Sequence, residues 1–317
     1  MSPAVQIAFQ IFLFVGGLLV ALLASSRAVD YTRALAAALG APAFVVGVAL
    51  VSIGTDLPEI ANAIAAHLEG KGDVNVGTAV GSSLVQYTFV VGLFPLIIPV
   101  IVVGRRQVLV VGVLTMAGLG ITSLFVADAW LSRLEGAILV FVWALFLLIV
   151  VRAAPGLIPD EPPTVAYQRR LVQAGVVLLT LGLVGVGATV AVEALIRLAE
   201  LAGVPEFLLG FFGASIGTSA PELIVDLTAL MRGAPGIAFG DAFGSSLVDA
   251  TLTVGIGGLV APAEVTPRLA ITGSVYSLIA VGVVASVLAA RRRHDRTSGA
   301  IFIGLYALSY VVLIGLR

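Results

Sequence analysis

The chain has 317 residues, of which 60% are hydrophobic and 11% charged, and its mean hydropathy is +1.14. So few charges cannot cover a water-soluble globule, and a net charge of -1 offers no basic surface for a nucleic acid. The absence of cysteine excludes disulfides, thiol catalysis and zinc–thiolate sites. The apolar runs are about 20 residues or longer, so we predict an all-α membrane protein rather than a barrel.

Ten apolar runs follow one another along the chain, bounded by charged or Pro/Gly-rich residues. We expect transmembrane helices at 4–26, 40–68, 74–103, 106–127, 130–152, 171–199, 204–231, 236–262, 269–290 and 298–316. The first run lacks a preceding basic segment, so we expect it to be a span rather than a cleaved secretion signal. Residues 153–170, rich in Pro and charge, are predicted to link a five-helix unit at 1–152 to another at 171–317.

The two halves contain the same segment. Residues 42–92 align without a gap on residues 205–255, at a constant offset of 163, and 21 of the 51 aligned pairs are identical. Five spans per half reverse the orientation of the second copy, which predicts ten transmembrane helices in two inverted repeats. Of the 17 Lys and Arg residues, 12 follow spans 1, 3, 5, 7 and 9. This bias places the linker in the cytoplasm and both termini outside the cell membrane.

A proline interrupts the second and the seventh span. Pro58 and Pro221 each remove a backbone donor and disfavour helical geometry at the preceding residue. We therefore expect helices 2 and 7 to be broken there, with carbonyl oxygens lining a cavity rather than facing lipid. Asp56 and Ser219 occupy the first position of a capping box, so they are expected in part to cap the half-helices that follow.

Each proline is followed by a glutamate, Glu59 or Glu222, at an equivalent depth in the bilayer. An acidic side chain near the centre of a spanning helix costs about 2.5 to 3.5 kcal/mol, so a mirrored pair indicates function. Other oxygen-bearing side chains lie nearby in the same segments: Thr55, Thr218, Ser82, Ser245, Ser219, Gln86, Asp249 and Asp56. This all-oxygen set predicts a site for hard cations such as Ca²⁺ and Na⁺.

Small residues recur in the third and eighth spans. Gly77 with Gly81, and Gly240 with Gly244, are spaced so that two helices can approach closely. Ser82 and Gln86 lie four residues apart, as do Ser245 and Asp249, so each pair presents oxygens on one helix face.

These paired segments resemble the alpha-repeats of the cation/calcium exchanger superfamily. The 27 positions from Glu59 to Gln86, and from Glu222 to Asp249, are similar to the spacing in archaeal sodium/calcium exchangers. The resemblance implies an antiporter rather than an enzyme, with Ca²⁺ and Na⁺ as transported ions, no cofactor, and the lipid bilayer as its surroundings. The resemblance does not imply a particular oligomeric state. It also implies alternating access, in which the first and sixth helices slide across the rest.

The resemblance implies roles for individual side chains. Calcium would be bound by Glu59 and Glu222 with help from Thr55 and Thr218. Sodium would use the same two glutamates together with four further side chains: Ser219, Ser82, Ser245 and Asp249.

The chain departs from the usual family pattern at three places. Asp56 stands where a serine is typical, Gln86 replaces an asparagine, and Thr78 and Asp241 replace the asparagine before Gly-Ser. A further acid makes the empty site more negative and favours protons, so a proton-coupled calcium antiporter is the alternative to sodium exchange. A passive channel is a third hypothesis, against which the inverted repeats argue.

One more acid is left open by the pattern. Asp226 follows Glu222 by one helical turn, and the equivalent residue of the first repeat is Ala63. It is either part of an ion entrance or a residue without a role in transport.

Overall fold

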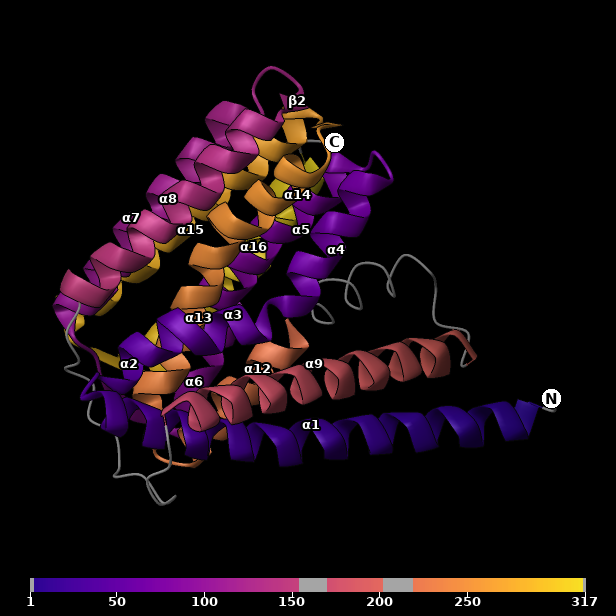
Figure 1. The fold of residues 1–317 in the computed structure, drawn as a ribbon, viewed down its shortest axis with the longest axis vertical. Coiled ribbons are helices and arrows are strands. Elements are labelled where there is room, and N and C mark those ends of the chain that lie inside the picture. The colour runs from indigo at the N-terminus through magenta and orange to yellow at the C-terminus, as the bar shows by residue number, and fades with distance from the viewer. Residues whose placement is uncertain (1–2, 154–169, 202–218, 316–317) are drawn as a thin grey trace.

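The computed structural model describes residues 3–153, 170–201 and 219–315, which are almost entirely helical (Figure 1). Seven helices of these ranges are long and apolar enough to cross a membrane. A bent pair, Ala43–Thr55 with Leu57–Leu68, adds an eighth span if it is counted as one. The chain is therefore a multi-pass membrane protein built from helices.

The first half consists of helices interrupted by short π-helical segments, labelled η. Its elements are α1 (Pro3–Leu39), α2 (Ala43–Val46), η1 (Gly47–Val51), α3 (Ser52–Thr55), α4 (Leu57–Leu68), α5 (Gly72–Val85), η2 (Gln86–Val90), α6 (Val91–Ile97), α7 (Arg105–Phe125) and α8 (Arg133–Ala153).

The second half repeats this pattern as far as it is described. Its elements are α9 (Arg170–Leu201), α12 (Ala220–Met231), α13 (Pro235–Leu247), η4 (Val248–Thr253), α14 (Val254–Val260), α15 (Pro267–Arg291) and α16 (Arg296–Gly315). Four short strands lie in the connections: β1 (Val100–Val102), β2 (Trp130–Leu131), β3 (Ala263–Glu264) and β4 (Arg293–Asp295).

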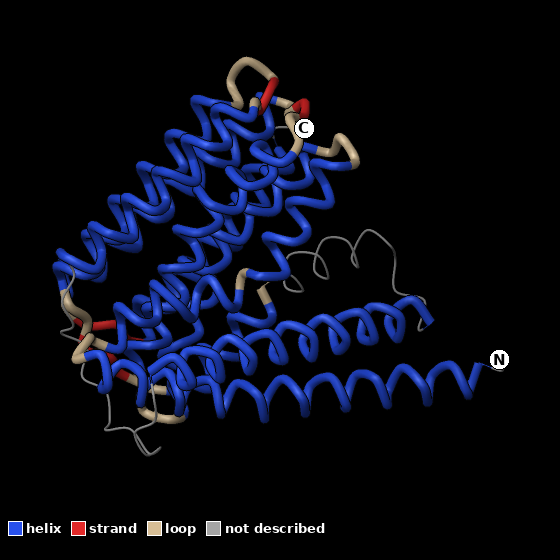
Figure 2. Tube along the Cα trace, viewed as in Figure 1, coloured by secondary structure: helices blue, strands red, loops and turns tan. Residues whose placement is uncertain are grey.

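The equivalent connections pair with each other across the halves. Strand β1 pairs with β4, and β2 pairs with β3, both antiparallel. Strand β3 is the counterpart of β1, and β4 is the counterpart of β2, each beginning 163 residues later. The second pair of strands therefore repeats the first with the two halves of the chain exchanged. Figure 2 shows the two small sheets at opposite ends of the helical bundle.

Helix α1 is longer than predicted. It continues to Leu39, whereas the charged residues after position 26 indicated a loop. These charges find partners at the end of α12: Asp30 forms an ion pair with Arg232 at 2.6 Å, and Arg33 donates to the Gly233 carbonyl at 3.2 Å. The helix can therefore continue past the apolar run, because its charged turns pack against another helix end.

Helices α1 and α9 lie side by side and cross one side of the bundle (Figure 1). Their contact depends on two glycines. A Cβ added to Gly17 would lie 2.6 Å from the Gly187 carbonyl oxygen, and one added to Gly187 would lie 2.7 Å from the Gly17 carbonyl oxygen. Only residues without a side chain allow the two backbones to approach this closely.

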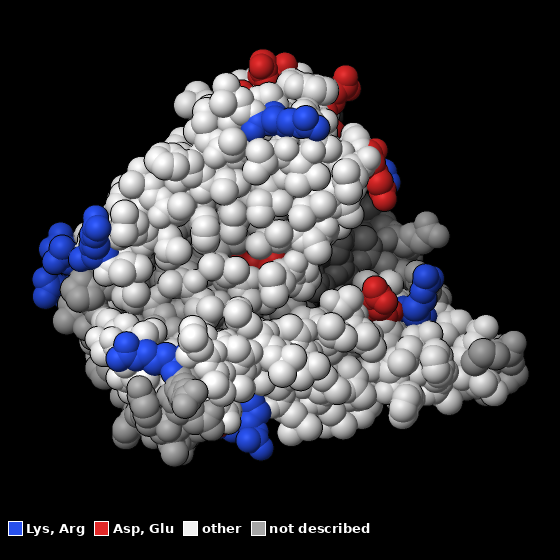
Figure 3. All heavy atoms as spheres, viewed as in Figure 1, with Lys and Arg blue, Asp and Glu red and all other residues white. Residues whose placement is uncertain are grey.

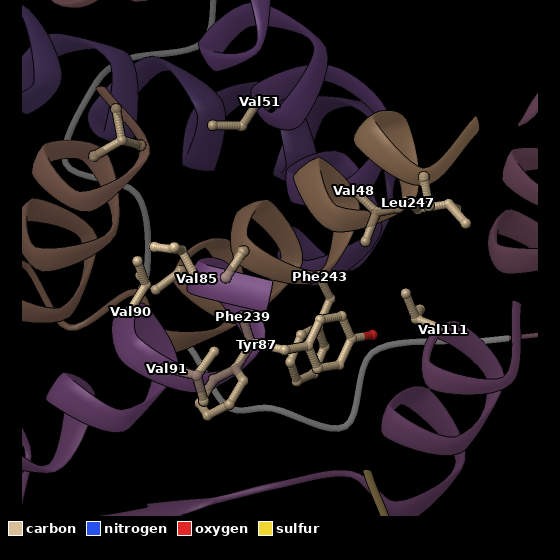
Figure 4. Packing of buried hydrophobic residues seen from close by; sticks show 14 of the residues in the cluster. Val48, Val51, Val85, Tyr87, Val90, Val91, Val111, Phe239, Phe243 and Leu247 are labelled. Carbon is tan, nitrogen blue, oxygen red and sulfur yellow. The ribbon is translucent and has the colours of Figure 1, made fainter. Parts of the chain in front are cut away.

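Helix α13 runs through the centre of the bundle and is buried throughout most of its length. Tyr87 stacks on Phe243 with ring centroids 4.7 Å apart, and Phe239 meets Phe94 edge-on at 5.1 Å. Figure 4 shows Tyr87, Phe239 and Phe243 packed among valines from several helices. Since Tyr87 follows Gln86, this packing fixes the position of the polar residues beside it.

The predicted close approach of the glycines holds for the eighth span. A Cβ on Gly240 would lie 2.4 Å from the Phe44 carbonyl oxygen, and one on Gly244 would lie 2.7 Å from the Val48 Cα atom. Gly77 and Gly81 have no described residue within 4 Å of an added Cβ. The equivalent neighbours, at 207 and 211, lie outside the described residues.

Candidate cation site

The second span is broken where Pro58 predicted. Helix α3 ends at Thr55, Asp56 lies between the helices, and α4 starts at Leu57 with its axis turned by 47°. In the seventh span, α12 starts at Ala220 directly after Ser219, with Pro221 as its second residue. The half-helix that would precede it lies outside the described residues, so only the first break is confirmed.

The residues at the two N-cap positions do not cap. Asp56 and Ser219 precede α4 and α12, yet neither side chain makes a capping hydrogen bond. Both carboxylate oxygens of Asp56 and the Ser219 hydroxyl are buried without a hydrogen-bond partner among the described residues. The expected capping role is therefore wrong for these side chains, because Asp56 lies against Glu59 and Glu222 instead.

Three carboxylates meet at the break. Each of Asp56, Glu59 and Glu222 offers an oxygen, and these oxygens all lie within 4.8 Å of one another. The side chains are 0%, 5% and 0% exposed. None of the three takes part in a salt bridge described for this structure. In a buried site such a group of acids needs a cation or bound protons, since unpaired buried charge is too costly.

Further free oxygens surround these three acids. Asp249 is fully buried and lies close enough to Asp56 and Glu59 to interact with them electrostatically. Its Oδ1 atom accepts from the Thr253 hydroxyl at 3.3 Å, whereas Oδ2 has no partner among the described residues. The buried Ser82 hydroxyl is also without a described partner. Such oxygens are available for a hard cation.

Other predicted ligands already have partners. The Thr55 hydroxyl lies 3.1 Å from Asp241 Oδ1, and the Ser245 hydroxyl lies 3.5 Å from the same atom. Gln86 Oε1 accepts a hydrogen bond from Ser246 at 2.9 Å. These three side chains therefore lie in the polar centre, but their oxygens are shared with protein groups. Thr218 lies outside the described residues.

The repeated serines next to the site bond to each other. Ser83 donates to the Ser246 carbonyl at 3.1 Å, and Ser246 lies 3.4 Å from the Ser83 carbonyl. The two residues are 163 positions apart, so equivalent points of the two repeats meet at the centre of the bundle.

The helices that bear Gln86 and Asp249 are distorted in the same way. Each residue lies in a π-helical segment, η2 or η4, in the middle of an otherwise α-helical span. Insertion of a wider turn changes the direction of the side chains around it, and such turns are frequent at functional sites. Hydropathy and residue type give no sign of this distortion.

Two further buried acids were not predicted as site residues from the sequence. In the sequence Asp241 stands out only as a departure from the family pattern, and the pattern assigns no role to Asp226. Both are fully buried in the structure. The cost of an acid inside the membrane, which singled out the glutamates, was the signal that could have found them.

The surroundings of the site are apolar. A cavity of about 380 Å³ lies between the break and α9 and is lined mainly by glycine, proline and aliphatic residues, among them Gly54, Pro58 and Leu181. Figure 3 shows the basic and acidic side chains at the margins of one face, with a single small acidic patch in the middle. An uncharged belt around buried acids is typical of a membrane protein with an internal ion site.

Comparison with known proteins gives the family. The model of the family described as sodium/calcium exchanger protein matches residues 9–152 and 172–315. The chain belongs to this family. The resemblance drawn from the repeated segments is thereby confirmed.

Relatives of this exchanger-family chain occur in bacteria and archaea. The putative antiporter CaxA of Alkalimonas amylolytica is 29% identical over 307 residues, which cover 92% of this chain and 94% of the relative. The inner membrane protein YrbG of Escherichia coli (strain K12) is 30% identical over 293 residues, 88% of either chain. The sodium/calcium exchanger MaX1 of Methanosarcina acetivorans is 24% identical over 292 residues, covering 78% and 82%.

Solved structures share the fold. The sodium-calcium exchanger NCX_Mj, soaked with 100 mM Na⁺ and 10 mM Sr²⁺, matches with a TM-score of 0.79 over 96% of this chain and 98% of its own. The sequence identity is 24%. At this identity the similarity establishes the fold of the exchanger-family chain and leaves the ions to be argued from its own residues.

Proposed function

We propose that the protein is a secondary active antiporter that exchanges Ca²⁺ for Na⁺ across the cell membrane. The observation that supports this most directly is the group of three buried carboxylates, Asp56, Glu59 and Glu222, with oxygens within 4.8 Å of one another. Two of them come from the first repeated segment and one from the second. A divalent cation with oxygen ligands compensates for such a group better than any protein side chain present there.

In the proposed architecture ten transmembrane helices form two inverted repeats, at 1–152 and 171–317, with a cytoplasmic linker at 153–170. The mutual hydrogen bonds of Ser83 and Ser246 support it, as does the exchanged pairing of the four strands. The bias of Lys and Arg supports extracellular termini.

The proposed ligands divide between the ions. Calcium is held by Glu59 and Glu222 with Thr55 and Thr218. Sodium takes the same glutamates with four further side chains: Ser219, Ser82, Ser245 and Asp249. Because both ions need Glu59 and Glu222, a bound Ca²⁺ and a full load of Na⁺ exclude each other, which couples their movements.

Access alternates, in this proposal, by movement of α1 and α9 across the other helices. The close glycine contact joins these two helices into one unit. The described polar links from α1 to α12 include Ser25 to Thr228 at 2.9 Å, Asp30 to Arg232 at 2.6 Å and Arg33 to Gly233 at 3.2 Å. A sliding motion of α1 would break these links and form others.

Proton-coupled calcium exchange is the second candidate, and the position of Asp56 favours it. Its carboxylate is fully buried next to Glu59 and Glu222 and has no donor among the described residues. A third acid at this place favours the binding of protons in the absence of a metal ion.

Calcium uptake into proteoliposomes tests the proposal. Sodium, potassium and pH gradients are imposed in turn, and vesicles with the double variant Glu59→Gln/Glu222→Gln serve as the control. We expect uptake only with an outward sodium gradient. Uptake driven by the pH gradient in sodium-free vesicles would replace sodium by protons, and a current that needs no counter-ion would indicate a channel instead.

A further inference from the structure

A second pair of acids lies beside the three carboxylates of the central site. Asp226 in α12 and Asp241 in α13 are both fully buried. Helices α12 and α13 pack against each other, and the two carboxylates lie close enough to interact electrostatically. Neither oxygen of Asp226, nor Oδ2 of Asp241, has a hydrogen-bond donor among the described residues. Three unpartnered carboxylate oxygens thus lie together in the interior of the protein.

Two hydroxyl groups lie close to one carboxylate oxygen of Asp241, and the other oxygen is available for a ligand. The Thr55 hydroxyl lies 3.1 Å from Oδ1 and the Ser245 hydroxyl lies 3.5 Å from it. Among the described salt bridges none involves Asp226 or Asp241, and the guanidinium at the end of α12, Arg232, is paired with Asp30. The negative charge of the pair is therefore not compensated by a described basic side chain.

The position of the pair is one helical turn away from the central acids. Asp226 follows Glu222 by four residues in α12, and Asp241 precedes Ser245 by four residues in α13. The turn at 232–234 joins these two helices. Since one α-helical turn rises about 5.4 Å, the pair lies between the central site and the end of the molecule where this turn is found.

The first repeat has no such pair. The residues equivalent to Asp226 and Asp241 are Ala63 and Thr78, 163 positions earlier. The same places in the fold are thus occupied by a small apolar and a neutral side chain, so packing of the helices does not require acids there. A buried acid in a membrane helix is costly, and two adjacent ones without a packing role indicate a ligand.

We propose that Asp226 and Asp241, with the Ser245 hydroxyl, form a second site for a hard cation, one turn from the central acids toward the α12–α13 turn. The inference rests on the proposed function, because the cation is the transported ion on its way between the central site and that face. Because these acids occur in only one repeat, the ion pathway is asymmetric. A cation binds transiently between the central site and the face of the α12–α13 turn, and no equivalent acid pair is present toward the opposite face.

Half-saturating Ca²⁺ concentrations, measured separately from each face, test this proposal. The variants are Asp226→Asn and Asp241→Asn, assayed in right-side-out and inside-out vesicles. The chain has no cysteine, so an impermeant maleimide on Lys71→Cys, at the exposed α4–α5 turn, identifies the face opposite the α12–α13 turn. Figure 1 shows α4 and α5 running away from α12 toward that opposite end.

We expect either variant to raise the half-saturating Ca²⁺ concentration about tenfold at the face of the α12–α13 turn, with little change at the other face. Transport retained from the other face shows that the variant is folded. Asp128→Asn, which removes an exposed acid from the α7–α8 connection, should change neither value. Equal increases at both faces, no increase at either face, or loss of transport in folded variants would overturn the second site.

An equilibrium measurement separates this inference from the proposed function. Binding of Mn²⁺ to detergent-solubilised protein, followed by the loss of the free-ion paramagnetic resonance signal, needs no transport. We expect one binding step to disappear in Asp226→Asn and the other to remain. If the unchanged protein binds Mn²⁺ in this way but exchanges no ions, the proposed function fails and the second site stands; identical binding curves contradict the site alone.

Discussion

The two copies of the repeated segment share their backbone where both are described, but not their charge. Glu59 and Glu222 occupy equivalent places. Three buried acids of the second copy have neutral counterparts in the first: Asp226, Asp241 and Asp249 stand opposite Ala63, Thr78 and Gln86. At the central site Asp56, opposite Ser219, reverses the difference. A nearly symmetric scaffold can therefore hold an asymmetric set of ligands, and the shared and unshared residues should behave differently when replaced.

The shared glutamates should give the largest effect. We expect Glu59→Gln and Glu222→Gln each to reduce exchange by at least about 100-fold, because each removes a charged ligand from a buried site. Sodium-driven ⁴⁵Ca²⁺ uptake in proteoliposomes measures this, with the monodisperse elution of each variant as the control for folding. Full activity in both variants would remove the shared acids from the site.

The unshared pair Asp249 and Gln86 should give unequal effects. Asp249→Asn is expected to lower exchange about tenfold, because Asp249 has an unpartnered oxygen beside Asp56 and Glu59. Gln86→Asn should change it less, because the Gln86 oxygen already accepts a hydrogen bond from Ser246. Initial rates at saturating Ca²⁺ and varied Na⁺ compare the two. A larger loss in the Gln86 variant would contradict the assignment.

The shared features of the site were predictable from the sequence. The cost of an acid in the membrane singled out Glu59 and Glu222, and the chemistry of proline located the break before Pro58. Both arguments depend on residue type and position alone, so they apply before any tertiary structure is known.

The arrangement within the site was not predictable in the same way. The Asp56 side chain leaves its N-cap role because two other carboxylates lie across the break, and one of them comes from a segment far away in the chain. The same holds for Asp241 and Thr55, whose contact joins the two halves. Local sequence patterns contain no information about such distant neighbours.

The first helices of the two halves offer a structural test. Gly17→Ala places a Cβ within 2.6 Å of the Gly187 carbonyl oxygen, whereas an added Cβ on the neighbouring Gly16 meets nothing within 4 Å of the described residues. We expect Gly17→Ala to reduce stability by about 1 to 3 kcal/mol. Gly16→Ala should be neutral or slightly stabilising. Thermal unfolding in detergent compares them, and equal melting temperatures would show that α1 and α9 do not need this contact.

Replacement of Asp56 should give the smallest effect, a shift in the pH dependence of Ca²⁺ uptake. Protons compete with Ca²⁺ for the carboxylates, so uptake falls as the pH is lowered. Asp56→Ser removes one negative charge beside Glu59 and Glu222, which then hold protons less firmly. The pH of half-maximal uptake should therefore move down, by about one unit or less. An unchanged pH profile at subsaturating Ca²⁺ would show that Asp56 has no part in proton competition.

The central claim is that Glu59 and Glu222 together hold the divalent cation. The most direct test is anomalous diffraction from crystals of this protein soaked in Sr²⁺, a heavier substitute for Ca²⁺. The account predicts a single strong anomalous peak between the two glutamate carboxylates, absent in Glu222→Gln. A peak elsewhere, or the two side chains pointing apart with no ion between them, would contradict it.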